Sequence, residues 1–299
     1  MLIHIGYHKT ATTWLQLFYF PHHPELAFIA GHDSLWQHFM SSSSLEFDPQ
    51  TVQQLFQSLI QQSLQVQQIP ILSAERLSGN PHAGGFDNKD MADRLKAVFP
   101  QAKILIVIRR QADAILSNYK QYIRVGGICN LSEYLNPPVD GRIPLFRLDN
   151  FAYHHLANYY VQQFGQNKVK VMLYEQFCKH PNQFIQELSQ FIGVSSNQQF
   201  PTEQQVNNSM SDLGILLKRQ INKWHGNDSL YPITPCCAWL TTRLSKTVEF
   251  LDQKHYLDFY QSHLKQQTQN TIGDRFKVSN ALLAEQFQLD LAAYGYDLP

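Results

Sequence analysis

The chain has 299 residues, of which 43% are hydrophobic, and this length is enough to bury one large core. Its 24 basic residues balance 24 acidic residues, which excludes a global positive field for binding nucleic acid or an anionic membrane. The four cysteines, at positions 129, 178, 236 and 237, fit neither a metal-binding spacing nor a disulfide framework.

Two further classes are excluded by the apolar runs. No run approaches the ~20 residues that span a bilayer. The apolar start of the chain is also too short for a signal-peptide core. We therefore expect a cytoplasmic protein without a transmembrane segment.

The first predicted element is a buried strand over Leu2–Ile5, which ends at Gly6. Lys9 follows, then the hydroxyls of Thr10, Thr12 and Thr13, and then an apolar pattern that suits a helix. A strand, a tight turn, a lysine and a helix start together form an anion cradle, because backbone N–H groups and the helix dipole face the ligand. The loop is not a Walker A sequence, since no second glycine precedes its lysine.

A second polar cluster follows a later strand. After a short strand over Glu25–Ala30 and a helix capped by Asp48, the run Ile69–Ser73 predicts another buried strand. Glu75 and Arg76 come directly after it. A carboxylate at such a strand end can act as a general base, or it can form a salt bridge with Arg76 or Arg109.

A third cluster follows the β-branched run Lys103–Ile108. Arg109 stands at the strand end, and the helix expected over Gln111–Arg124 carries Asp113 and Ser117. An arginine offers a planar fork for phosphate oxygens, and a residue eight positions later lies on nearly the same helix face.

The remaining elements complete an alternating order. We expect a helix over Lys89–Phe99, a long loop over residues 125–150, a helix over Phe151–Phe164 and a strand over Val169–Tyr174. A helix from Pro181 to Phe191 follows, then a mostly helical tail with a closing helix over Ile272–Tyr294. This order predicts an α/β fold with a parallel sheet flanked by helices, and ligands bind beyond the carboxyl ends of such strands. We expect a single domain, with an α/β core over 1–200 and a helical extension over 201–299.

The three clusters together resemble sulfotransferases that use 3′-phosphoadenosine-5′-phosphosulfate (PAPS), in their bacterial and carbohydrate-type forms. The first loop is similar to their H-I-G-x-x-K-T-G-T-T-x-L-Q segment, with Ala11 in place of the usual glycine. A backbone φ above zero at Ala11 would be mildly strained. Arg109, Asp113 and Ser117 match their R-x-x-x-D-x-x-x-S segment, and S-x-E-x-L matches at Glu75.

The resemblance implies a P-loop-like fold and transfer of a sulfuryl group from PAPS to a hydroxyl of a carbohydrate or small metabolite. It implies that Lys9 and Glu75 are catalytic, and that Arg109 and Ser117 bind the 3′-phosphate. The 5′-phosphate site is implied for Lys9, Thr10, Ala11, Thr12, Thr13 and Trp14. No metal is required, and Glu175 is expected to anchor backbone or an arginine. The second 3′-phosphate clamp of the cytosolic enzymes, R-K-G-x-x-G-D-W, is absent.

Other functions stay open at this point. A P-loop-type kinase and a non-catalytic adenine-nucleotide-binding module are the alternatives, and the missing Walker A loop disfavours the kinase. If Glu75 is not the base, His32 or a histidine near residue 154 is the next candidate. The sequence names neither the acceptor nor the oligomeric state.

Overall fold

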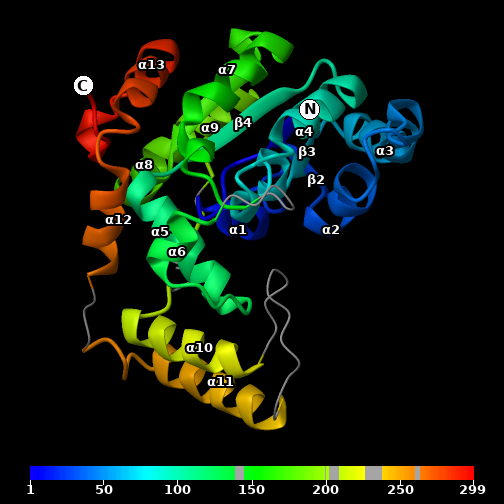
Figure 1. The fold of residues 1–299 in the computed structure, drawn as a ribbon. Coiled ribbons are helices and arrows are strands. Elements are labelled where there is room, and N and C mark those ends of the chain that lie inside the picture. Colours follow the sequence, from blue (N-terminus) through cyan, green and yellow to red (C-terminus); the bar gives the residue numbers. More distant parts are fainter. Residues whose placement is uncertain (139–144, 199, 202–208, 226–237, 260–262) are drawn as a thin grey trace. The chain divides into compact units, whose positions relative to one another are not determined.

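The computed structural model describes residues 1–138, 145–198, 200–201, 209–225, 238–259 and 263–299, which form two compact units (Figure 1). The first unit contains Met1–Arg110, Asp149–Gln204 and Phe276–Pro299. The second contains Gln111–Leu148 and Gln205–Arg275. The expectation of one domain with a helical extension stays a prediction.

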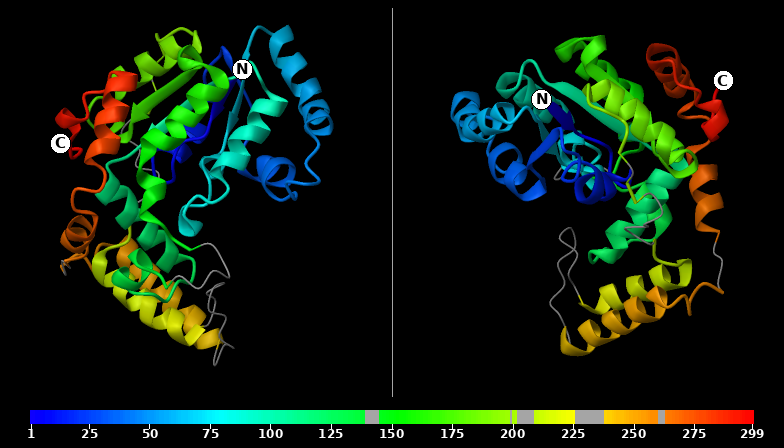
Figure 2. Two further views of the ribbon diagram at one scale, coloured as in Figure 1. Left: turned by 45° about the horizontal axis from the view of Figure 1, so that its top comes forward. Right: turned by 180° about the vertical axis from the view of Figure 1, so that it is seen from behind.

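The first unit is built on a parallel sheet of five strands in the order β2-β3-β1-β4-β5 (Figure 2). The strands are β1 (Leu2–His4), β2 (Leu26–Ala30), β3 (Ile69–Ser73), β4 (Lys103–Ile108) and β5 (Val169–Leu173). Apolar runs such as Ile104–Ile108 are buried along their whole length, as strands covered on both faces require. The predicted α/β class and parallel sheet are confirmed.

Helices cover both faces of this sheet. The connection from β1 to β2, through α1 (Thr12–Trp14) and η1 (Leu15–Tyr19), runs in the opposite direction along the sheet from the later connections. Because such crossovers are right-handed, the two directions put their helices on opposite faces. On the face opposite η1, three helices pack side by side: α3 (Pro49–Gln65), α4 (Asn88–Val98) and α7 (Tyr153–Phe164). On the face covered by η1, the hydroxyl oxygens of Tyr19 in η1 and Ser189 in α9 (Pro181–Ile192) lie 2.8 Å apart.

Local sequence signals account for the positions of several helix ends. Asp48 caps α3 by accepting hydrogen bonds from the backbone N–H groups of Gln50 and Thr51. Pro181 begins α9, and Gly193 ends it in the left-handed conformation. The helix predicted over Gln111–Arg124 has the same bounds in the structure, as α5.

Two predictions of secondary structure were wrong. The segment predicted as a loop over 125–150 contains α6 (Leu131–Leu135), which a capping box between Asn130 and Glu133 begins. The expected closing helix over Ile272–Tyr294 is interrupted. Its parts are the end of α12 (Leu264–Ile272), α13 (Lys277–Phe287) and η7 (Ala292–Tyr294). Gly273 and Gln288 adopt φ values of 50° and 53°, which end the helices beside them.

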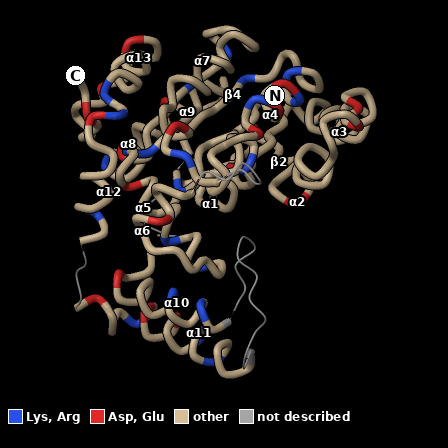
Figure 3. The backbone as a smooth tube through the Cα atoms, in the orientation of Figure 1, with Lys and Arg blue, Asp and Glu red and all other residues tan. Residues whose placement is uncertain are grey.

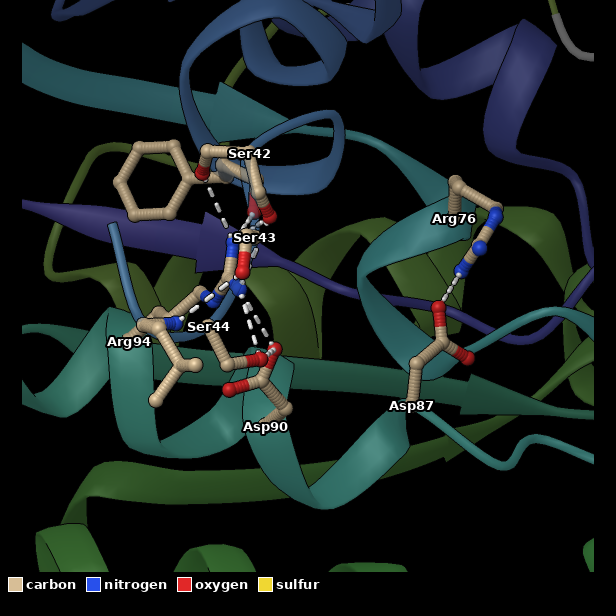
Figure 4. A network of polar contacts seen from close by, with 9 residues as sticks. Ser42, Ser43, Ser44, Arg76, Asp87, Asp90 and Arg94 are labelled. Atoms are coloured by element: carbon tan, nitrogen blue, oxygen red, sulfur yellow. Dashed lines mark hydrogen bonds and ion pairs between the residues drawn. The ribbon is translucent and has the colours of Figure 1, made fainter. Parts of the chain in front are cut away.

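The other short elements of the first unit are α2 (His32–Leu35), η2 (Trp36–Met40), η3 (Glu75–Ser78), η4 (Pro81–Ala83), η6 (Gln166–Lys168) and α8 (Tyr174–Lys179). Residues Leu148–Phe151 form η5. Side-chain hydrogen bonds and ion pairs brace this region (Figure 4). Arg94 on α4 donates to the carbonyls of Phe39 and Ser42, and it pairs with Asp90.

The second unit is helical and contains α5, α6, α10 (Asp212–His225), α11 (Ala238–Gln253) and α12. Asn222 of α10 donates to the carbonyls of Ile123 and Gly127 at 2.7 and 2.9 Å, so a buried amide joins α10 to the end of α5. Cys236 and Cys237 lie outside the described residues.

Basic and acidic residues are scattered along the backbone of the described residues (Figure 3). Among those residues, no helix is long and apolar enough to cross a membrane.

Candidate functional site

Three loops meet at one edge of the sheet. Strand β1 lies between β3 and β4, and all three are parallel, so the segments that follow them leave from the same edge. Backbone hydrogen bonds continue the pairing beyond β1, from Ala74 N–H to the His4 carbonyl and from Tyr7 N–H to the Val107 carbonyl. The sheet therefore brings together the loops that carry Lys9, Glu75 and Arg109.

The first loop leaves β1 with its backbone at Gly6 close to the ring of His4. Nδ1 of His4 lies 2.8 Å from Oγ of Ser73, its register partner in β3. A Cβ atom on Gly6 would lie only 2.4 Å from His4 Nε2, so the position requires glycine. Gln16 donates to the Ser73 carbonyl at 2.8 Å and ties the following helix to the same strand.

The loop itself has a backbone suited to an anion. Lys9 and Ala11 adopt left-handed conformations, with φ values of 68° and 63°, on either side of the buried Thr10. The Thr10 hydroxyl donates to the Tyr7 carbonyl and holds the turn closed. Successive backbone N–H groups in turns that contain left-handed residues form concavities that bind anions. The hydroxyl of Thr12 is buried in the same loop and helps to lower the pKa of Glu75.

The helix that follows is anchored by Trp14. Its ring lies 4.8 Å from that of Phe177, and Nε1 donates to the Pro201 carbonyl at 3.1 Å. The Trp14 side chain is therefore part of the aromatic core of the first unit. Its contribution to a phosphate site would come from the backbone.

Glu75 stands directly after β3, at the start of η3. Its Oε1 lies 3.3 Å from Nδ1 of His8, in the first loop. Arg76 turns away and pairs with Asp87 at 2.5 Å (Figure 4), so it is not the partner of Glu75. Burial raises the pKa of Glu75, but the hydrogen bond and charge of His8 and the charge of Lys9 outweigh it. The resulting pKa is lowered, and the carboxylate is ionised at neutral pH.

His82 is a further member of this cluster. It lies on η4, where Asn80 accepts a hydrogen bond from its backbone N–H. Burial, together with the smaller effect of the charges of His8 and Lys9, lowers the pKa of His82 to about 4. Sequence reasoning missed both histidines. The only sequence signal was that His8 lies inside the loop motif, next to Lys9.

The other histidines considered as a base have different surroundings. His32 is exposed on α2 and pairs with its neighbour Asp33. His154 on α7 hydrogen-bonds to Ser279 of α13 at 2.6 Å. No contact of either with Glu75 or Lys9 is present among the described residues. Those residues also contain no group of three or more His, Cys, Asp or Glu side chains arranged to hold a metal.

Arg109 ends β4 and reaches the first loop. Its Nη1 donates to the Lys9 carbonyl at 3.4 Å, and its Cζ lies 4.8 Å from the centre of the Tyr174 ring. Tyr153 donates to the Arg109 carbonyl at 2.7 Å and fixes the strand end. Arg109 thus has its backbone held and its guanidinium beside the loop that carries Lys9.

Glu175 has the anchoring role expected from the sequence. Its Oε1 accepts from the backbone N–H of Arg110 at 2.9 Å, and its Oε2 accepts from the Tyr296 hydroxyl at 2.9 Å. Ser117 lies two turns into α5, half-buried, in the second unit. The assignment of a 3′-phosphate to Arg109 and Ser117 stays a prediction.

Comparison with solved structures finds sulfotransferases with a similar fold. Over 98% of the chain and 97% of the other, the fold is similar to a sulfotransferase from Alicyclobacillus acidocaldarius, with 16% identity and a TM-score of 0.57. The sulfotransferase domain of the Synechococcus PCC 7002 olefin synthase is 13% identical over 83% of this chain and 94% of that one, with a TM-score of 0.40. A mouse sulfotransferase solved with 3′,5′-adenosine bisphosphate (PAP) is 13% identical over 97% and 85%, with a TM-score of 0.38.

A comparison with curated protein sequences gave no match. The model of the sulfotransferase family matches residues 23–198, a segment that contains Glu75, Arg109 and Ser117 and begins after the Lys9 loop. The match extends over more than half of the 299 residues. The chain belongs to the sulfotransferase family, and it is an enzyme of that family.

Proposed function

We propose that the protein transfers a sulfuryl group from PAPS to a hydroxyl of a carbohydrate or another small metabolite. The observation that carries this proposal is the meeting of the Lys9 loop, Glu75 and Arg109 at one sheet edge. An anion-binding backbone, a lysine and an ionised carboxylate are then available to one reacting group. The family membership supports the same reaction class.

The donor supplies an activated sulfuryl group on a phosphate leaving group. Lys9 and the N–H groups of residues 10–13 would hold the 5′-phosphate, and Lys9 would stabilise negative charge on the bridging oxygen as the S–O bond breaks. Arg109 and Ser117 would hold the 3′-phosphate, because a guanidinium fork and a hydroxyl both donate to phosphate oxygens. By analogy with phosphoryl transfer, positioning and charge stabilisation supply most of the rate.

The acceptor hydroxyl must lose its proton as the new O–S bond forms. Glu75 accounts for this step: its carboxylate is ionised and lies beside Lys9 and His8. We assign the proton uptake to the pair formed by Glu75 and His8.

The donor assignment is tested by thermal unfolding with PAP, ADP and ATP at equal concentrations. PAP alone carries a 3′-phosphate, so it should raise Tm well above the effect of ADP, since a ligand of the native state stabilises by RT ln(1 + [L]/Kd). Equal shifts from PAP and ADP would contradict a 3′-phosphate site. A larger shift from ATP would favour the kinase.

The acceptor is tested separately with [35S]PAPS and a panel of methyl glycosides and simple alcohols. A labelled product from a glycoside supports a carbohydrate acceptor, and a product from alcohols alone supports a small metabolite. If the protein prefers PAP but labels no compound and releases no [35S]sulfate to water, it is a nucleotide-binding module.

A further inference from the structure

We propose that Nε2 of His8 takes the proton from the acceptor hydroxyl, and that Glu75 orients His8 and stabilises its charged form. This inference rests on the proposed sulfuryl transfer. It changes the role of Glu75 from the proton-accepting atom to a positioning residue, and it adds a catalytic residue within the Lys9 loop.

Glu75 determines which ring nitrogen of His8 carries the hydrogen. Nδ1 of His8 lies 3.3 Å from Oε1 of Glu75. An ionised carboxylate only accepts hydrogen bonds, so Nδ1 must carry the hydrogen that points at it. In the neutral imidazole the lone pair then belongs to Nε2, because one ring nitrogen donates and the other accepts. Glu75 therefore selects the tautomer in which Nε2 is basic.

Nε2 of His8 is an unusual buried atom. It is buried, and among the described residues it has no hydrogen-bond partner. Buried polar atoms of side chains are normally bonded, and an exception requires an explanation. A substrate hydroxyl that donates to Nε2 supplies one, since Lys9, the residue assigned to the reacting phosphosulfate, is the next residue in the chain.

Glu75 is suited to stabilise a charged His8. The pKa of Glu75 is lowered, because the interactions with His8 and Lys9 outweigh its burial. A carboxylate with a lowered pKa is a weak base but a good partner for an imidazolium. The same feature that weakens Glu75 as a base strengthens it as the partner of His8.

Proton transfer to His8 accompanies the transfer of the sulfuryl group. The acceptor oxygen forms its bond to sulfur while its proton passes to Nε2 of His8. The bond between sulfur and the bridging oxygen breaks, and its electron pair stays on the phosphate beside Lys9. His8 is then an imidazolium paired with Glu75, and it returns its proton to water after the products leave.

Glu75 on η3 contacts His8, and the charges of His8 and Lys9 act on His82 of η4. His82 has its pKa lowered to about 4, so it is neutral near pH 7.

The first test is the pH profile of kcat/KM for transfer from [35S]PAPS to the first methyl glycoside or alcohol that the wild-type protein labels. If it labels none, the acceptor is water and the readout is [35S]sulfate release. We expect an acid limb, because a protonated Nε2 cannot take the proton of the acceptor. His8→Gln should lower the rate by about 10²–10⁴ and abolish this limb. Added imidazole should restore part of the rate in His8→Ala, a rescue that a purely structural role would not show.

His82→Gln and His32→Gln are the matched controls, and both should keep the acid limb. A limb that persists in His8→Gln, or that disappears in His82→Gln, would overturn the assignment to His8. Each variant must keep the PAP-induced rise in Tm, which separates loss of the base from loss of the donor site.

A second test needs no turnover. In ¹⁵N-histidine NMR spectra of the full chain at pH 8, Nε2 of His8 should be unprotonated, and Glu75→Gln should reduce this tautomer preference. A proton on Nε2 in the wild-type protein would refute the inference. If PAP and ADP shift Tm equally, the proposed function itself fails, whatever the NMR result.

Discussion

The guanidinium of Arg109 donates a hydrogen bond to the backbone carbonyl of Lys9, at 3.4 Å, across 100 residues of sequence. The residues assigned to the 3′-phosphate and to the 5′-phosphosulfate of the donor are therefore in direct contact. Arg109 both presents a fork for phosphate and supports the loop that carries Lys9, so its loss affects the site in two ways.

Arg109→Ala should abolish the preference for PAP over ADP, because the 3′-phosphate loses its main cation. Arg109→Lys should restore only part of the preference, since an ammonium cannot form a bidentate contact. Ser117→Ala should weaken the preference by a smaller factor. Titrations of PAP and ADP followed by Tm measure all three, and an unchanged preference in Arg109→Ala places the 3′-phosphate elsewhere.

Lys9→Ala should lower kcat/KM for sulfuryl transfer by about 10²–10⁴, the range expected when a preorganised group that stabilises developing charge is removed. Lys9→Arg should rescue little, because a planar fork differs from a compact ammonium. Lys9→Gly is the control that removes the amino group without straining the backbone, since Lys9 has a φ of 68° that glycine adopts freely. Wild-type turnover in Lys9→Ala would show that the loop is structural.

Glu75→Gln should reduce single-turnover transfer by about 10²–10⁴ while leaving PAP affinity nearly unchanged. The amide keeps the shape of the side chain but cannot stabilise a charged His8. Rapid-quench measurement with [35S]PAPS gives the rate, and the PAP-induced rise in Tm gives the affinity. Normal transfer would remove Glu75 from the mechanism, and loss of PAP binding would make it a residue that shapes the pocket.

Ala11→Gly should stabilise the protein by about 0.5–1 kcal/mol, because Ala11 has a φ of 63° and glycine adopts this conformation without a Cβ penalty. This corresponds to a rise in Tm of about 1–3 °C. Ala281→Gly, within helix α13, is the opposite control and should cost about 1 kcal/mol. A lower Tm for Ala11→Gly would show that the loop is not strained at this residue.

Stability should fall as the pH is lowered from about 6.5 to 4. Burial lowers the pKa of His4 from 6.5 to about 4 in the folded protein. The unfolded chain therefore binds the proton first, and the contribution of His4 is complete above pH 6.5 and lost toward pH 4. The loss is about 3 kcal/mol for His4.

His82 has its pKa lowered in the same direction, to about 4. Urea unfolding at pH 7.5, 5.5 and 4.5 measures the slope, which His82→Gln should reduce and His32→Gln should leave unchanged. Constant stability over this range would mean that His4 and His82 titrate alike in the folded and unfolded states.

The sequence by itself determined the elements that depend on local patterns. The runs Ile69–Ser73 and Gln111–Arg124 have the same bounds in the structure, because apolar periodicity and turn residues act over a few positions. The strand, turn and helix start around Lys9 were also readable, since they form a local arrangement, and the binding of an anion there stays a prediction. Even the strained φ at Ala11 followed from the alanine that replaces a glycine.

Only the tertiary structure decided which of these residues meet. The pairing of His8 with Glu75 depends on β1 lying next to β3, and a pairing between strands that are distant in sequence is not encoded in either segment alone. The direction of the Glu75 pKa shift had the same origin, because it balances burial against the charges of His8 and Lys9. His82 carries no motif at all, and only the fold brings it within reach of the charges of His8 and Lys9.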